Sequence, residues 1–180
     1  MIRILRGKIL EKISPHFVLD VSGIGFLIHS PLSTFDHIEE NKEVTIYTQC
    51  LFKEDEGFIY GFLNPDELKT FQDLISVPGV GPKSALNILS RFSPEEISQA
   101  IENENLELLA SVPKIGKKAA SKIVLELKGR LRFAEESTVI NQAINALCSL
   151  GLTRNEAMQR VKGLPKELSL EELIKRALRK

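Results

Sequence analysis

The sequence shows few of the features that mark disulfide-rich, zinc-binding, membrane-spanning or secreted proteins. Among its 180 residues there is no tryptophan, and its two cysteines, Cys50 and Cys148, lie far apart. This pattern indicates neither a disulfide framework nor a zinc site, and it fits a reducing cytoplasm. No apolar run approaches the roughly 20 residues that cross a bilayer. The first residues alternate charged and apolar side chains, which is not typical of a signal peptide.

Net charge is absent as well, because 24 Lys and Arg residues balance 24 Asp and Glu residues. Proteins that bind nucleic acid are usually basic, so this balance counts mildly against such a partner. If DNA is bound, the positive charge must be gathered on one face. The apolar fraction of 43% and the charged fraction of 27% are ordinary for a folded protein. The length allows one large domain or two to three small ones.

The most informative feature present is an internal repeat. Residues Leu74–Leu89 (LISVPGVGPKSALNIL) and Leu109–Val124 (LASVPKIGKKAASKIV) align with Gly81 against Gly116, and half of the aligned positions are identical. Each copy predicts the end of a helix, a tight turn with Pro and Gly, and a second helix that opens with small residues and Lys.

The start of a helix is a site suited to phosphate, because its first N–H groups are unpaired and its dipole end is positive. Gly79 and Gly81 are expected to allow positive φ and a close approach of phosphate, while Val80 should pack the turn into the core. Pro-Gly turns join helices in many proteins, but two copies in tandem favour a grip on a nucleic-acid backbone. The candidate DNA-binding residues are Gly79, Val80, Gly81, Lys83, Ser84, Lys114, Gly116, Lys117, Lys118 and Lys122.

Residues 1–63 read as strands separated by turns, and a short helix is possible near Ser33–Ile38. About five strands in this length predict a small barrel, with the OB-fold as the leading candidate and an unrelated five-stranded barrel as the alternative. The histidines His16, His29 and His37 are expected in the core or on the surface rather than as ligands. The expected strands are Ile2–Leu10, Phe17–Val21, Gly25–His29, Val44–Thr48 and Phe58–Phe62.

From residue 64 to 133 the periodicity is helical, and Ser93 to Glu96 predicts a helix start with a capping box. Residues 129–138 are the expected linker. Residues 139–180 predict three short amphipathic helices, with Gly151 ending the first of them. Because so small a unit has a marginal core, we expect it to dock a partner. The predicted class is therefore α+β: a barrel, an all-helical repeat domain and a three-helix tail.

Between two apolar runs, residues 53–57 read Lys-Glu-Asp-Glu-Gly, which predicts a β-hairpin with an acidic tip. Three carboxylates at a tip are most often a soluble turn. Close to DNA, Glu54 and Asp55 would repel phosphate and could keep strands apart. They could instead hold Mg²⁺, although no further ligand with suitable spacing is evident.

The tandem copies resemble the helix-hairpin-helix motif of DNA-binding proteins, with Lys114 at the position of the first consensus glycine. Either Lys114 adopts the backbone angle of glycine at some cost, or the second hairpin is reshaped. The whole chain is similar to the RuvA family, the Holliday-junction-binding subunits of the bacterial branch migration complex. The segments that carry this resemblance are LRGKI at 5–9, KEDEGFIYGF at 53–62, both hairpins, and ALCSLGL at 146–152.

This resemblance implies a non-catalytic homotetramer that holds a four-way junction open in recombination and DNA repair, with one or two tetramers per junction. It places an acidic pin at Glu54 and Asp55. It also implies a UBA-like tail that binds a RuvB-type hexameric ATPase, with a RuvC-type resolvase as a further partner in the complex. No cofactor is implied.

Two other classes of function compete with this one. The first class is an enzyme. An ATPase is disfavoured because Gly79–Ser84 lacks the Gly-Lys pair of a phosphate-binding loop and Gly116-Lys117 lacks the following Ser or Thr. A helix-hairpin-helix glycosylase would need an Asp downstream, and none follows Asp73. The second class is a protein-interaction adaptor with weak DNA binding, in which the tail is the working end. Its candidate partner-binding residues are Leu147, Leu150 and Leu152.

Overall fold

A computed structural model describes residues 2–53, 56–131, 143–144, 146–147, 149–152, 154–161 and 168–178. The chain forms two compact units, Met1–Leu131 and Arg132–Lys180. None of the helices in the described ranges is both long and apolar enough to cross a membrane.

The N-terminal unit begins with the expected five-stranded closed barrel. Its strands follow the order β1-β2-β3-β5-β4, and all neighbouring pairs are antiparallel except β3 and β5, which run parallel. Alternating side chains such as Phe17, Leu19, Ile28 and Ile46 are fully buried inside it, as the two-residue period of a strand requires. The strands are β1 (Ile4–Ile13), β2 (His16–Val21), β3 (Ile24–His29), β4 (Glu43–Lys53) and β5 (Glu56–Phe62).

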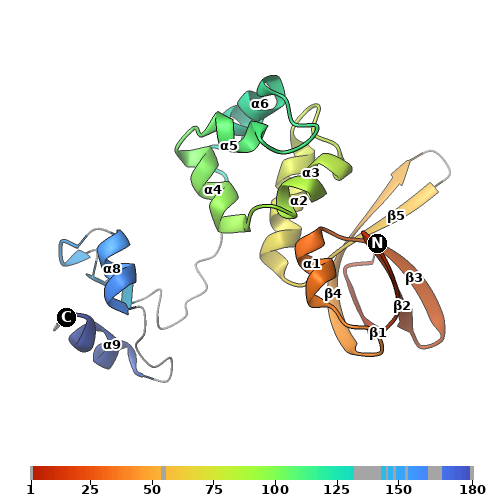
Figure 1. The fold of residues 1–180 in the computed structure, drawn as a ribbon, viewed down its shortest axis with the longest axis horizontal. Helices are drawn as coiled ribbons and strands as arrows, with labels where there is room; N and C mark the ends of the chain where they lie inside the picture. The colour runs from red at the N-terminus through yellow and green to blue at the C-terminus, as the bar shows by residue number, and fades with distance from the viewer. Residues whose placement is uncertain are drawn as a thin grey trace. The chain divides into compact units, whose positions relative to one another are not determined.

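Strands β4 and β5 extend past the barrel as a two-stranded arm (Figure 1). Their pairing continues from Tyr47↔Phe62 to Lys53↔Glu56, well beyond the residues that pair with β1 and β3. The hairpin predicted from the sequence is therefore present. Its expected acidic tip residues, Glu54 and Asp55, lie outside the described residues.

A run of helices follows the barrel. Ser93 caps α4 in the predicted capping box: its side chain accepts from the amide of Glu96, whose carboxylate accepts from the amide of Ser93. Asn64 caps α2 in a similar way by accepting from the amide of Glu67. The helices are α1 (Leu32–His37), which lies between β3 and β4, and α2 (Pro65–Ser76), α3 (Pro82–Leu89), α4 (Pro94–Glu102), α5 (Leu106–Ala110) and α6 (Lys117–Leu127).

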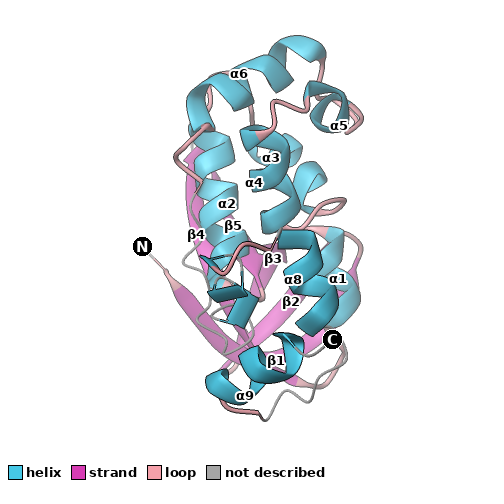
Figure 2. Ribbon diagram, turned by 90° about the vertical axis from the view of Figure 1, so that its left-hand side faces the viewer, coloured by secondary structure: helices cyan, strands magenta, loops and turns pink. Residues whose placement is uncertain are grey.

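Polar contacts from α1 fix the helices to the barrel. Ser33 Oγ donates to the carbonyl of Leu89 at 3.1 Å, and the amide of Leu32 donates to Ser90 Oγ at 2.8 Å. The buried carboxylate of Glu67 accepts from Thr34 Oγ1 and from the Leu63 amide. Figure 2 shows α2 alongside β4 and β5, with which it is in contact. The hairpins that follow α2 and α5 are thus carried by one body with the barrel.

The C-terminal unit contains α8 (Arg154–Val161) and α9 (Leu170–Leu178), preceded by helical residues at 143–144, 146–147 and 149. Gly151 ends the preceding helix with φ +98, as expected, and the Leu152 amide donates to the Leu147 carbonyl. Ser169 caps α9 together with Glu172. A small apolar core gathers residues from these segments: Ile144, Leu147, Ala157, Val161 and Ala177.

Candidate nucleic-acid interface

The two hairpins have nearly the same backbone. In the first, the Val80 amide donates to the Val77 carbonyl at 3.0 Å, and in the second the Ile115 amide donates to the Val112 carbonyl at 3.0 Å. Gly81 begins α3 with φ −88 and ψ 170, and Gly116 begins α6 with φ −85 and ψ 169. The sequence repeat is therefore a structural repeat.

Lys114 adopts the backbone angle of the glycine it replaces. Its φ is +71, against +94 for Gly79 at the equivalent position. A left-handed conformation costs a non-glycine residue about 1–2 kcal/mol. Of the two alternatives that the sequence leaves open, the second hairpin keeps its shape at the expense of local strain.

Neither the backbone angle nor the packing within the protein requires glycine at positions 81 and 116. The expected positive φ at Gly81 is wrong: the residue is extended, because it is the N-cap of α3 and precedes Pro82. A Cβ built on either glycine meets nothing within 4 Å. The protein itself thus tolerates a side chain at both positions, and the bare surface is open to an incoming group.

Backbone donors at both helix starts are unused. No hydrogen bond joins the amides of Gly81, Lys83, Gly116, Lys117 or Lys118 to an acceptor in the described part of the chain. The amide of Ser84 differs, since it donates to the Gly81 carbonyl at 3.0 Å. Val80 is 5% exposed and its amide is bonded within the turn, so it supports the hairpin from inside.

Exposed lysines surround these donors. Lys83 follows the first turn, Lys114 lies within the second, and three more project from the first two turns of α6: Lys117, Lys118 and Lys122. Among the residues that the structure describes, none of the five forms an ion pair. Lys83 and Lys114 line one and the same groove, so each hairpin contributes one lysine to a common surface.

That groove lies between the hairpins and the barrel and has a volume of about 700 Å³. His16 and His29 from the barrel line it, with their ring centroids 4.2 Å apart. Burial lowers the pKa of His29, and the nearby His16 and Lys83 lower it further. Sequence reasoning did not find this groove, because the residues that form it come from distant segments and no local pattern joins them.

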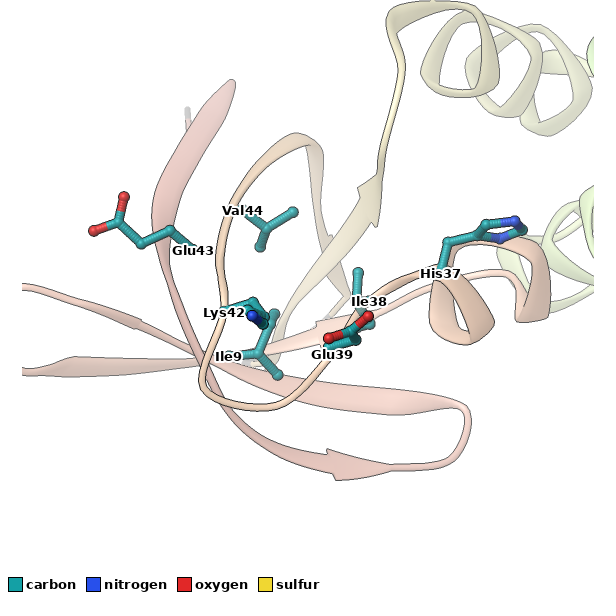
Figure 3. Close-up of a pocket in the computed structure, with 7 residues that line it drawn as sticks. All are labelled: Ile9, His37, Ile38, Glu39, Lys42, Glu43 and Val44. Atoms are coloured by element: carbon teal, nitrogen blue, oxygen red, sulfur yellow. The ribbon is translucent and has the colours of Figure 1, made fainter.

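A second hollow of about 280 Å³ lies beside the loop between α1 and β4 (Figure 3). Its lining mixes Glu39 and Glu43 with Lys42 and His37. His37 Nδ1 lies 2.6 Å from the Ser33 carbonyl. Charges of both signs and a bonded imidazole give this hollow no preference for an anion. No group of three or more metal-ligating side chains occurs in the described ranges.

The tail candidates differ in exposure. Leu147 is fully buried in the core of the C-terminal unit, Leu152 is half-buried, and Leu150 is 61% exposed. Only Leu150 of the three presents most of its apolar surface to solvent.

Comparison with known proteins decides the family. A relative from Coxiella burnetii is 40% identical over 194 residues, and the match covers 99% of this chain and 97% of the relative. A relative from Burkholderia lata is 37% identical over 188 residues with the same coverage. Both are named Holliday junction branch migration complex subunit RuvA. The chain belongs to the RuvA family.

Family models agree along the length of the chain. The RuvA N-terminal domain matches residues 1–61 and the RuvA C-terminal domain matches residues 138–180. Between them, the SAM-like helix-hairpin-helix tandem matches residues 71–129, which contain both hairpins. The RuvA resemblance expected from the sequence is confirmed, and so is the fold class.

Proposed function

We propose that this protein is the junction-binding subunit of a branch migration complex, acting in recombination and repair without catalysing a reaction or using a cofactor. The proposal rests on the two matched helix starts. Each has backbone amides without an acceptor, a glycine with open space beside it, and exposed lysines. Amides at a helix start and nearby ammonium groups are the donors that hold phosphate in nucleic-acid complexes.

Contacts of this kind position a duplex arm without reading its sequence, so specificity must come from the shape of the junction. Four copies of the chain in a homotetramer, or two such tetramers, would match four arms by symmetry. Log affinity should fall with log salt by about 0.9 for each phosphate neutralised.

The β4–β5 arm supplies the second part of the proposed mechanism. In the sequence, the acidic residues Glu54 and Asp55 stand between Lys53, the last residue of β4, and Glu56, the first residue of β5. Carboxylates repel phosphate, so an acidic tip near the crossover would keep exchanging strands apart rather than bind them.

The C-terminal unit is the proposed dock for the ATP-driven motor, a hexameric ATPase of the RuvB type, with a RuvC-type resolvase as a further partner of the complex in the cytoplasm. The exposed side chain of Leu150 and its half-buried neighbour Leu152 support this role. Leu147 supports the dock from within the core.

Alanine at Gly81 and Gly116 tests the hairpins directly. Since neither Cβ would meet a protein atom within 4 Å and neither φ is positive, the doubly substituted protein should melt close to the wild-type temperature. The lower entropy of its unfolded chain is offset by the weaker N-cap that alanine makes. Its affinity for a four-way junction should fall at least about tenfold, because each added methyl group displaces a phosphate bonded to amides. An unchanged gel shift with a labelled junction would contradict the proposal.

Charge reversal provides an independent test of the second hairpin. The combined change Lys117→Glu and Lys118→Glu should abolish junction binding and leave the folded state intact, as read by circular dichroism. The matched control, Lys42→Glu with Lys175→Glu, makes the same change in net charge at exposed positions outside the hairpins and should bind almost normally. Equal binding by wild type to linear duplex and to junction would favour the adaptor alternative.

A further inference from the structure

Among the described residues, the Lys, Arg, Asp and Glu side chains that line the groove between the barrel and the hairpins are all positively charged ones. Lys83 and Arg91 come from α3 and the turn after it, and Lys114 comes from the second hairpin. No carboxylate occurs among the described residues that line it. A concave site with several cations and no anion concentrates positive potential and favours an anionic ligand.

Its barrel wall is aromatic. The ring of His29 lies 4.2 Å from that of His16, 5.6 Å from Phe58 and 5.5 Å from Tyr60, measured between centroids. Tyr60 in turn stacks on Phe71. His29 and Phe58 are half-buried, so part of each ring remains open to the groove. Rings held in place from behind give a flat ligand a firm surface to stack on.

Polar groups complete the lining. Asn87 extends from α3 one turn after Lys83 and faces the same groove. The buried Nδ1 atom of His16 has no hydrogen-bond partner among the described residues. A volume of about 700 Å³ is within the range of small-ligand sites.

We propose that this groove binds an unpaired nucleotide of a DNA strand, with its phosphate on Lys83, Arg91 and Lys114 and its base against His29 and Phe58. The combination of a basic channel with an aromatic wall is the chemistry that binds single-stranded nucleic acid without reading its sequence. The inference rests on the proposed function and deepens it, since a protein that serves strand exchange meets unpaired nucleotides as well as duplex arms.

The site can be tested with a short fluorescein-labelled oligothymidylate, whose bases do not pair with one another. Anisotropy titration at low salt should show binding by the full-length protein. Phe58→Leu, which keeps an apolar side chain but removes the ring, should weaken that binding at least about fivefold, the lower end of what one stacked base contributes. Arg91→Gln should weaken it and reduce its salt dependence, whereas Lys42→Gln, at an exposed position outside the groove, should not.

The imidazole of His29 supplies a second readout, independent of affinity. Bound phosphate should raise the pKa of His29 above its value in the free protein, because a nearby anion favours the charged ring, and NMR titration of the ring protons measures this. Inorganic phosphate at equal ionic strength is the reference. An equal rise with phosphate alone would overturn the assignment of a nucleotide, as would oligothymidylate binding that neither Phe58→Leu nor Arg91→Gln changes.

These results separate the groove from the hairpins. If the groove variants leave oligothymidylate binding intact while Gly81→Ala with Gly116→Ala abolishes junction binding, the groove proposal fails and the proposed function stands. If the glycine variants leave junction binding intact, the proposed function fails first.

Discussion

Replacing Lys114 with glycine should stabilise the fold and weaken the hold on DNA at the same time. Lys114 has φ +71, a conformation that costs a residue with a Cβ about 1–2 kcal/mol. Glycine removes that cost. It also loses more conformational entropy on folding, which destabilises the folded state by about 0.5–1 kcal/mol. Subtracting the two ranges gives a net gain of about 0–1.5 kcal/mol. The midpoint, about 0.75 kcal/mol, corresponds to roughly 1.5–3 °C in melting temperature for a chain of this size.

Lys114→Gly should also weaken DNA binding, because it removes a positive charge. If the Lys114 ammonium group neutralises one phosphate, its removal should reduce the slope of log affinity against log salt by about 0.9. Thermal unfolding by circular dichroism measures the stability, and junction titrations at several salt concentrations measure the slope. Lys114→Gln is the matched control: it removes the same charge but keeps the strained backbone, so it should change the slope without raising the melting temperature.

The reciprocal change in the first hairpin, Gly79→Lys, tests the same reasoning in the opposite direction. Gly79 has φ +94, and no atom lies within 4 Å of the position that a Cβ would take there, so Gly79→Lys introduces backbone strain without a clash. It should lower the melting temperature by about as much as Lys114→Gly raises it. The reasoning is refuted if Lys114→Gly does not stabilise the protein or if Gly79→Lys does not destabilise it.

Two further predictions concern other parts of the chain. Burial raises the pKa of Glu67, so the folded state binds its proton more tightly than the unfolded state, and unfolding free energy should fall as pH rises from about 4.5. Glu67→Gln should lack this component, and a melting-temperature difference from wild type that stays constant between about pH 4.5 and about pH 7 would contradict the sign. Deleting residues 139–180 should leave junction binding intact and end stimulation of the ATPase partner; loss of the gel shift would refute that division.

Strand positions are predictable from the sequence, but several strand ends are not. The expected first strand stops at Leu10, whereas β1 continues to Ile13, which pairs with His16. The expected fourth strand stops at Thr48, whereas β4 continues to Lys53 because β5 pairs with it along the arm. Local composition signals the start of such a segment, but a partner strand decides where it ends.

The hairpins are predictable because a repeat is visible without any structure. Their finer geometry is not predictable. Gly81 is extended rather than left-handed, and the strained left-handed backbone lies at Lys114, the counterpart of Gly79. The groove lies beyond sequence reasoning altogether, since His29, Arg91 and Lys114 are brought together only by tertiary packing. Single histidines in strands give no signal that distinguishes a ligand-facing ring from a core ring.

The hydrogen bonds from α1 have a mechanical consequence. Leu32 and Ser33 of α1 hydrogen-bond to Ser90 and Leu89 at the end of α3, so the element that follows β3 is joined directly to the helix that begins at the first hairpin. We infer that these bonds hold the binding surface in one shape, so that the bending on binding falls on the nucleic acid. We therefore expect crossovers whose arms splay easily to be favoured over those whose arms are held in firm coaxial stacks.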